Sequence, residues 1–225
     1  MKTYYSIIEI LVNIYAVDDG NLQILLKRKK EEPFQDYWIL PGTILSKDET
    51  IEEATEDIMI AATGLPSIFK AQGDIFSDLN RDPNERIVAC NYFAITIKSL
   101  VNNQDSHEMK WFNVNDLPRL GYDHRKIIDD NLDKIRRQII HNENGILFKL
   151  FPSTFTLPEL QRIFEAVSGE KLDRRNFRKK VISNDLVSET GEFKTSKQGR
   201  PGKLYRLNGK LEKRSILWWT RGDGV

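Results

Sequence analysis

The stretch that decides the fold covers residues 40–65 and reads LPGTILSKDETIEEATEDIMIAATGL. Thr50 is followed three residues later by Glu53, which is the spacing of a capping box, in which each side chain binds the other residue's backbone N–H group. Apolar residues then recur at helical spacing, and Gly64 ends the run. The pattern predicts a loop, a capped helix and a second loop.

Strand patterns surround this helix. Runs rich in β-branched and aromatic residues predict strands over residues 6–17, 22–29 and 86–97. The DDGN sequence between the first two runs is a turn signal and predicts a hairpin. Residues 109–120 read as a strand that runs into a short turn, and residues 124–140 have helical periodicity. Strands and helices therefore alternate irregularly, as in an α+β domain.

The last third of the chain changes character. Thr156 and Glu159 form a second capping box, which predicts a helix over 155–169, and Asp173 caps another predicted helix over 172–182. The segments LVSETGEF and KLYRL, separated by a polar GRPG loop, predict a β-ribbon. This order of elements is the one expected of a winged helix-turn-helix.

The segment HNENG at 141–145 is the predicted domain boundary. It gives one domain over residues 1–143 and another over residues 144–225.

Charge is distributed unevenly between the two parts, although the 225 residues carry a net charge of only +1. Residues 1–154 hold 18 Lys+Arg against 24 Asp+Glu, and residues 155–225 hold 16 against 9. A basic domain is a candidate for binding nucleic acid, and a solvated basic face explains the count equally well. A single cysteine and the lack of a signal-peptide pattern favour a cytoplasmic location.

Residues 40–65 resemble the Nudix box, whose family pattern is GX5EX7REUXEEXGU with U a bulky aliphatic residue. The positions that match the loop-helix-loop are Leu40, Pro41, Gly42, Glu49, Ile51, Glu52, Glu53, Ala54, Thr63, Gly64 and Leu65. In this register Thr43 stands at the first glycine and Asp57 at the arginine. Ile58 stands at the glutamate that follows, and Ala61 and Ala62 stand at the paired glutamates.

The box glutamates of the family bind divalent cations, which neutralise a diphosphate and activate the attacking water. Alanine and isoleucine offer no lone pair to a metal, and the three histidines have no metal-ligand spacing. The resemblance and its departures imply a domain that binds a nucleotide-like effector without cleaving it, with no catalytic residue, metal or cofactor. An active Nudix hydrolase of ADP-ribose or a related compound is the alternative, and an RNA-binding or scaffold role is a third.

Residues 147–207 resemble the C-terminal winged helix of the Nudix-related transcriptional regulators of the NrtR type. FTLPELQRIFEA, DRRNFRKK and GRPGKLYRL carry the resemblance. It implies an α+β fold, in which a Nudix-like α/β/α sandwich with a mixed sheet precedes a winged helix-turn-helix. It also implies a repressor of NAD metabolism or sugar catabolism that binds a palindromic operator as a homodimer. The effector implied is ADP-ribose or a sugar derivative.

The second helix of the basic domain has an apolar side, formed by Phe177 and Val181, and several cations on its other faces. These cations repel each other unless they meet phosphates or guanine edges. The predicted DNA-contacting residues of this helix and of the wing are Arg174, Arg175, Asn176, Arg178, Lys179, Lys180, Lys197, Arg200 and Lys203, and Lys194 lies on the same wing. For Asn176, helix packing is preferred over reading an adenine edge.

The segment SDLNRDPNERIVACNYFAI resembles a loop and strand of these regulators and of ADP-ribose-cleaving Nudix enzymes. Arg81 and Arg86 are candidates for binding a diphosphate, with Asp82 orienting one of them. A turn with a local ion pair explains these residues equally well. Arg28 and Trp38 are candidates for lining the same cleft. In the tail, Trp218 and Trp219 stand side by side, and packing on the wing and a dimer contact both remain open.

Overall fold

The computed structural model of the chain describes residues 5–65, 68–102, 107–141, 146, 150, 153–195 and 201–208. The chain divides into two compact units. One consists of residues 1–18 and 22–134, and the other of residues 19–21 and 135–225. The predicted break between residues 143 and 144 lies outside the described residues, as do Trp218 and Trp219. The domain limits 1–143 and 144–225 therefore stay a prediction.

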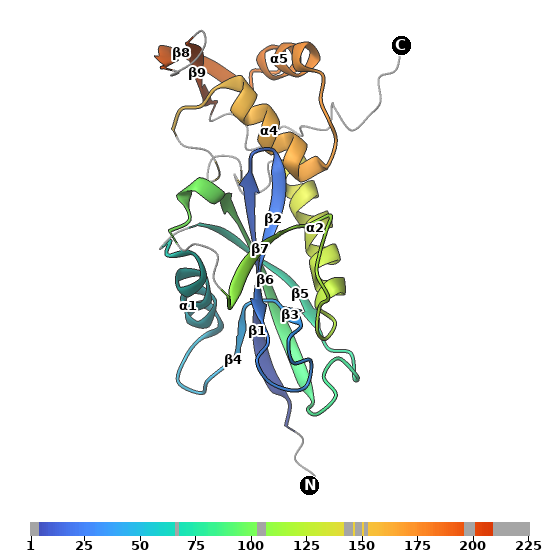
Figure 1. The fold of residues 1–225 in the computed structure, drawn as a ribbon. Coiled ribbons are helices and arrows are strands. Elements are labelled where there is room, and N and C mark those ends of the chain that lie inside the picture. Colours follow the sequence, from blue (N-terminus) through green and yellow to red (C-terminus); the bar gives the residue numbers. More distant parts are fainter. Residues whose placement is uncertain are drawn as a thin grey trace. The chain divides into compact units, whose positions relative to one another are not determined.

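The first unit is built on a seven-stranded mixed sheet (Figure 1). Its strands are β1 (Ile7–Asp18), β2 (Asn21–Arg28), β3 (Trp38–Ile39), β4 (Gly42–Ile44), β5 (Phe69–Phe76), β6 (Ile87–Ile97) and β7 (Met109–Asn113). The order is β3-β2-β1-β6-β5, with β4 paired to β1 and β7 paired to β2. β1 and β6 run parallel, whereas β4, β5 and β7 pair antiparallel with their neighbours. The predicted hairpin and strands are confirmed.

Two helices cover the faces of this sheet, α1 (Ile51–Thr63) and α2 (His124–His141), and a short 3-10 helix η1 (Lys98–Leu100) follows β6 (Figure 1). Val12 and Ile14 of β1 pack in one cluster with Met59 of α1. The next residue along β1, Tyr15, points to the other face, where its hydroxyl donates to the carbonyl of Ile128 in α2 at 3.2 Å. Side chains alternate across a strand, so one strand serves both layers. The α/β/α sandwich is confirmed.

The capped helix forms as the sequence predicts. The Thr50 hydroxyl accepts from the N–H of Glu53 at 3.2 Å, and the Glu53 carboxylate accepts from the N–H of Thr50 at 2.8 Å. Gly64 ends α1 in the left-handed conformation, with φ of 70°. Ahead of the helix, a Cβ on Gly42 would lie 2.6 Å from the Ile10 carbonyl oxygen, so only glycine lets β4 approach β1. These contacts fix where the box helix begins and ends.

A chain of buried amides joins the sheet to α2. The Asn131 side chain donates to the Asn91 oxygen at 2.6 Å and to the carbonyl of Ile127 at 2.8 Å. Asn91 in turn donates to the carbonyl of Leu11 at 3.2 Å. A Cβ on Gly73 would come within 2.4 Å of the Asn91 oxygen, so β5 has no room for a side chain here. Buried polar groups are tolerated when they are paired in this way.

The second unit contains α4 (Leu157–Ser168), α5 (Arg174–Ser183), β8 (Val187–Lys194) and β9 (Gly202–Leu207) (Figure 1). The second capping box is present at Thr156 and Glu159, and Asp173 caps α5 by accepting from the N–H of Asn176 at 2.8 Å. Phe164 of α4 packs against Phe177 of α5, with ring centroids 6.0 Å apart. Helix, helix and two-stranded ribbon make up the predicted winged helix.

None of the described helices is long and apolar enough to cross a membrane.

Candidate functional site

The box positions of α1 are apolar and largely packed. Ala62 is only 4% exposed and belongs to the core cluster that includes Met59 and Val12, and Ile58 packs against the same cluster. Ala61, one residue earlier, is exposed. The helix face that holds cations in Nudix enzymes therefore presents methyl and sec-butyl groups here.

Three carboxylates near the box have partners outside a metal site. Glu53 belongs to the capping box, and its hydrogen bonds with Thr50 lower the pKa of its carboxyl. Glu49 accepts from the N–H of Ser46 at 2.6 Å, and Glu56 pairs with Lys70 at 2.5 Å. Throughout the described part of the chain, no group of three or more His, Cys, Asp or Glu side chains is placed to hold a metal ion. The residues of the box do not fit a divalent cation.

Arg81 is a buried residue that joins three segments. Its side chain donates from Nε and Nη2 to the two oxygens of Asp123, at 3.2 and 3.1 Å, and from Nη1 to Glu9 at 3.0 Å. Arg81 is 5% exposed. Burial raises the pKa of the Glu9 carboxyl, although the charge of Arg81 opposes that change. The structure thus gives Arg81 an ion-pair network, with partners 42 and 72 residues away in sequence rather than local ones.

The other two residues of this loop bind its backbone. The Asp82 carboxylate accepts from the N–H groups of Asn84 and Glu85, at 2.8 and 3.0 Å, rather than orienting an arginine. Arg86 donates from Nη1 to the carbonyl of Ser77 at 2.9 Å. The structure places Arg81, Asp82 and Arg86 on one loop, but their side chains have separate partners. Their roles toward an effector stay predictions.

Arg28 and Trp38 are brought together as partners in the β2–β3 ladder. Arg28 forms an ion pair with Asp36 at 2.9 Å, and its side chain is half exposed. Trp38 packs edge-on against Phe112, with ring centroids 4.8 Å apart.

Arg28 also lines a cavity of about 250 Å³, whose lining residues are Lys27, Arg28, Lys29, Lys30, Glu31 and Ile39. Sequence reasoning missed the cations that flank Arg28, although the run KRKK is the signal that could have found them.

His124 is a second group that sequence reasoning left without a role. It is 1% exposed, and its Nδ1 accepts from the N–H of Leu40 at 2.9 Å. Burial, with a smaller effect from the charge of Arg81, lowers the pKa of His124 to about 3. The ring is therefore neutral, with its proton on Nε2, an atom that has no hydrogen-bond partner among the described residues. His124 ties the loop that opens the box to the start of α2.

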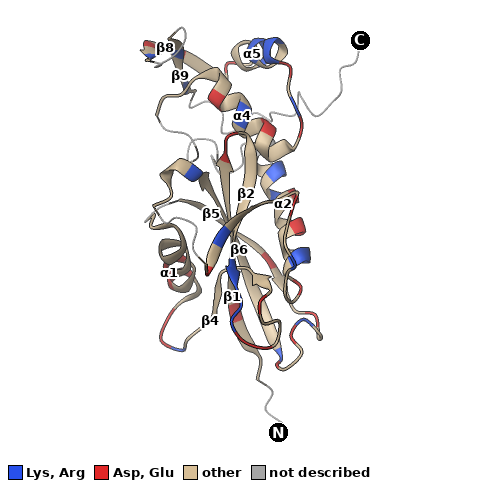
Figure 2. Ribbon diagram, in the orientation of Figure 1, with Lys and Arg blue, Asp and Glu red and all other residues tan. Residues whose placement is uncertain are grey.

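In the second unit, Lys and Arg residues are concentrated on α5, where much of the ribbon is blue in Figure 2. Phe177 and Val181 are buried, at 3% and 0% exposed, as predicted. The exposed residues are Arg174, Arg175, Asn176, Arg178 and Lys179, and Lys180 is partly buried. The preference for Asn176 as a packing residue is wrong, because its side chain lies on the exposed face among the cations.

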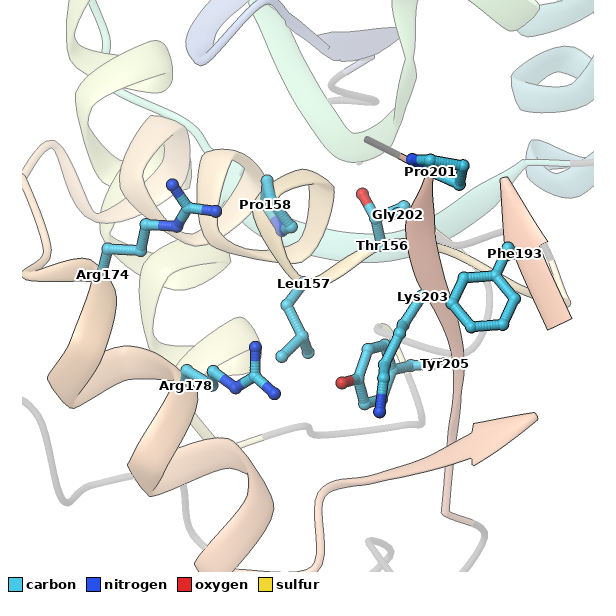
Figure 3. Close-up of a pocket in the computed structure, with 10 residues that line it drawn as sticks. All are labelled: Thr156, Leu157, Pro158, Arg174, Arg178, Phe193, Pro201, Gly202, Lys203 and Tyr205. Carbon is cyan, nitrogen blue, oxygen red and sulfur yellow. The ribbon is translucent and has the colours of Figure 1, made fainter. Parts of the chain in front are cut away.

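A groove of about 570 Å³ lies between this helix, the start of α4 and the wing (Figure 3). Its lining residues are Thr156, Leu157, Pro158, Arg174, Arg178, Phe193, Pro201, Gly202, Lys203 and Tyr205. Figure 3 shows Arg178 extending from the helix toward Lys203 and Tyr205 on the ribbon. The structure thus brings Arg174, Arg178 and Lys203 to one concave surface.

Two of the described cations of the wing have carboxylate partners. Lys203 pairs with Glu189 at 2.8 Å, and Lys194 pairs with Glu159 at 2.5 Å. Lys197 and Arg200 lie outside the described residues. The two pairs could not be foreseen from local patterns, because each joins residues from different elements.

Two family models match the chain. A NUDIX domain matches residues 9–130, and an NrtR DNA-binding winged helix domain matches residues 147–207. A relative from Acinetobacter baylyi, an ADPR responsive transcriptional repressor, is 30% identical over 200 residues, which is 86% of this chain and 79% of that protein. The ADP-ribose pyrophosphatase of Methanocaldococcus jannaschii is 30% identical over 131 residues, covering 58% of this chain and 78% of the enzyme.

Among solved structures, the NrtR of Shewanella oneidensis in complex with a 27mer DNA has a TM-score of 0.74 at 25% identity. The match covers 91% of this chain and 95% of that one. The similarity to regulators therefore extends over both units, whereas the similarity to the pyrophosphatase covers 58% of the chain.

Proposed function

This chain belongs to the NrtR family of Nudix-related transcriptional regulators, and from that premise we propose that it is an ADP-ribose-responsive repressor whose Nudix domain has lost catalysis. The observation that carries the proposal is the pairing of two features. The box helix has apolar side chains where metal ligands are needed, and α5 presents a row of exposed cations beside a wing. The first removes hydrolysis, and the second supplies a DNA-binding face.

Loss of catalysis follows from the chemistry of the box. Hydrolysis of a diphosphate needs metal ions to neutralise the developing charge and to activate water. Ile58, Ala61 and Ala62 supply no ligand atoms, and Glu49, Glu53 and Glu56 nearby have other partners. Binding does not require transition-state stabilisation, so such a domain still senses a ligand.

ADP-ribose is the effector we propose, because the relative from Acinetobacter baylyi responds to it. A sugar derivative is the substitute. Without metal ions, the diphosphate needs cationic side chains. The cavity at the end of β2 offers Lys27, Arg28, Lys29 and Lys30, of which Arg28 is the best suited to bind a diphosphate with two donors at once.

Trp38 is the ladder partner of Arg28, and its ring is the candidate surface for a base or a ribose. On the neighbouring loop, Asp82 and Arg86 are further effector candidates. Arg81 acts by anchoring that loop through Glu9 and Asp123.

For DNA, we propose that α5 enters the major groove and that the wing contacts the backbone. Arg174, Arg175 and Arg178 are the principal contacts, supported by Lys179 and Lys180. Asn176 is exposed at the start of the helix, where an amide can pair with an adenine edge. Lys197, Arg200 and Lys203 are the proposed wing contacts.

We propose that two copies bind a palindromic operator, because helix-turn-helix dimers place one recognition helix in each half-site. The regulated genes proposed are those of NAD metabolism or sugar catabolism. The mass of the protein in solution, with and without an operator duplex, tests the homodimer.

A mobility-shift experiment tests the function. The probe is duplex DNA from the region upstream of the chain's own gene, and ADP-ribose is added in increasing amounts. We expect a retarded protein–DNA complex that dissociates when ADP-ribose is added. If no duplex is retarded even at low ionic strength, the DNA-binding proposal is wrong.

A second experiment separates sensor from enzyme. The protein is incubated with ADP-ribose and Mg²⁺, and AMP is measured against the same reaction without protein. We expect no AMP above that background. Formation of AMP at ordinary enzymatic rates would favour the alternative, a Nudix hydrolase.

A further inference from the structure

Glu189 is an acidic residue among the cations of the proposed DNA-binding face. It lies on β8, and its two oxygens accept from Lys203 Nζ at 3.1 and 2.8 Å. One of these oxygens also accepts from the Tyr205 hydroxyl at 3.1 Å. Hydrogen bonds from Lys203 and Tyr205, with a smaller effect from the charge of Arg178, lower the pKa of the Glu189 carboxyl. The group is therefore an anion at neutral pH.

The partners of Glu189 are lining residues of the groove. Arg178, Lys203 and Tyr205 all face the same concave surface (Figure 3). A DNA phosphate that enters the groove to meet Lys203 meets the Glu189 carboxylate at the same place. The phosphate and the carboxylate are both negative and repel each other there, and Lys203 cannot neutralise both at once.

We propose that Glu189 is an attenuating residue of the DNA-binding face, which neutralises Lys203 and so weakens the phosphate-mediated part of binding to DNA of any sequence. The inference rests on the proposed DNA-binding function. Nonspecific binding comes almost entirely from phosphate contacts, whereas an operator adds contacts to base edges. Both modes use phosphate contacts, so a fixed anion on the phosphate-binding surface lowers both affinities by a similar factor.

The test is Glu189→Gln, which keeps the shape of the side chain and an oxygen that accepts from Tyr205. The matched control is Glu192→Gln. Glu192 is an exposed residue of the same strand, and Lys203 pairs with Glu189 rather than with Glu192. Both variants lose one negative charge from the wing, so the control removes the general effect of net charge.

Affinities are measured by fluorescence anisotropy over a range of salt concentrations. One duplex is the upstream DNA that the wild type retards, and the other is a scrambled duplex of equal length. For Glu189→Gln, we expect affinity for both duplexes to rise by a similar factor, about fivefold to tenfold, as one released lysine allows. The slope of log affinity against log salt concentration should steepen by about 0.9, the value for one further phosphate neutralised by a lysine. Glu192→Gln should change both affinities slightly and equally.

A double-mutant cycle with Lys203→Gln adds a second readout. If Glu189 neutralises Lys203, removing the lysine should cost little affinity in the wild type and several-fold more in the Glu189→Gln background. Equal costs in both backgrounds would overturn the inference, and so would a Glu189→Gln variant that behaves like Glu192→Gln. These results differ from failure of the proposed function, in which the wild type binds neither duplex at low salt.

Discussion

Ala61 and Ala62 are neighbours on α1 with opposite surroundings, since Ala61 is exposed and Ala62 is 4% exposed within the core cluster. Glutamates at these two positions ligate cations in Nudix enzymes. Here the second position has become part of the packing, together with Ile58. In the box register, Ile58 and Ala62 thus serve packing, whereas Ala61 faces solvent.

A matched pair of variants tests this difference. Ala61→Glu should leave stability nearly unchanged, whereas Ala62→Glu should lower the free energy of unfolding by about 3 kcal/mol, because it places a carboxylate in an apolar cluster. Urea denaturation measures both. Equal stabilities would show that the face around Ala62 is open, in which case restoring glutamates at Ile58, Ala61 and Ala62 should confer Mg²⁺ affinity that calorimetry detects.

His124 makes stability depend on pH. Its pKa is about 3 in the fold against an ordinary value of 6.5, so the unfolded chain takes up this proton first as the pH falls. Stability from His124 is complete above pH 6.5 and declines as the pH drops from there toward 3, by at most about 1.4 kcal/mol per pH unit. His124→Asn keeps an acceptor for the Leu40 N–H and removes the titration.

We therefore expect a flatter stability profile between pH 7.5 and 5 for His124→Asn, measured by urea denaturation. The exposed His107 supplies the control, and His107→Asn should follow the wild-type profile. A His124→Asn profile as steep as that of the wild type would show that other groups cause the acid sensitivity.

At the scale of the element, α5 has one face that packs against its domain and other faces that carry positive charge. Phe177 and Val181 fix the helix to its domain, and the remaining residues carry the charge. Because the cations are exposed and are not needed for packing, they can be changed without loss of the fold.

Replacing Arg174, Arg175 and Arg178 with alanine should weaken binding to the upstream duplex strongly. It should also flatten the salt dependence, by about 0.9 in slope for each phosphate that the protein no longer neutralises. The control variant removes three exposed cations of the first unit, Lys47, Arg125 and Lys126. Anisotropy titrations compare the two. If both variants lose affinity equally, α5 is not the recognition helix.

Local sequence patterns predicted the helices and strands well, but they could not predict side-chain partners that are distant in sequence. Both capping boxes form because their residues are three positions apart and need no tertiary information. The Arg81 network could not be predicted, since Glu9 and Asp123 come from the first strand and from the start of α2. The apolar periodicity of α5 placed Phe177 correctly, but polarity alone could not tell a packed Asn176 from an exposed one.

At the scale of the whole molecule, the chain joins an acidic effector domain to a basic DNA-binding domain. A ligand that binds one of two conformations more tightly shifts their populations, and the coupling acts equally in both directions. Under the proposed function, the factor by which ADP-ribose weakens DNA binding must therefore also appear as weaker ADP-ribose binding in the presence of the operator.

ADP-ribose should raise the thermal unfolding midpoint of the protein, since at 100 times its Kd a ligand adds about 2.7 kcal/mol of stability. Differential scanning fluorimetry against AMP, ribose 5-phosphate and free sugars identifies the effector class. The shift should not need Mg²⁺. A shift that appears only with Mg²⁺ would contradict the loss of the metal site, and a shift with a sugar alone would replace ADP-ribose as the effector.

The parallel pairing of β1 with β6 has a consequence for how the chain is made. Ile7 pairs with Ile87, so the central ladder cannot close until about 80 further residues have left the ribosome. During that interval the apolar first strand has no lasting neighbour on that side, and such non-local topologies fold slowly. Synthesis that stalls before β6 would leave the apolar edge of β1 exposed on the nascent chain, where we expect chaperones at the exit tunnel to bind.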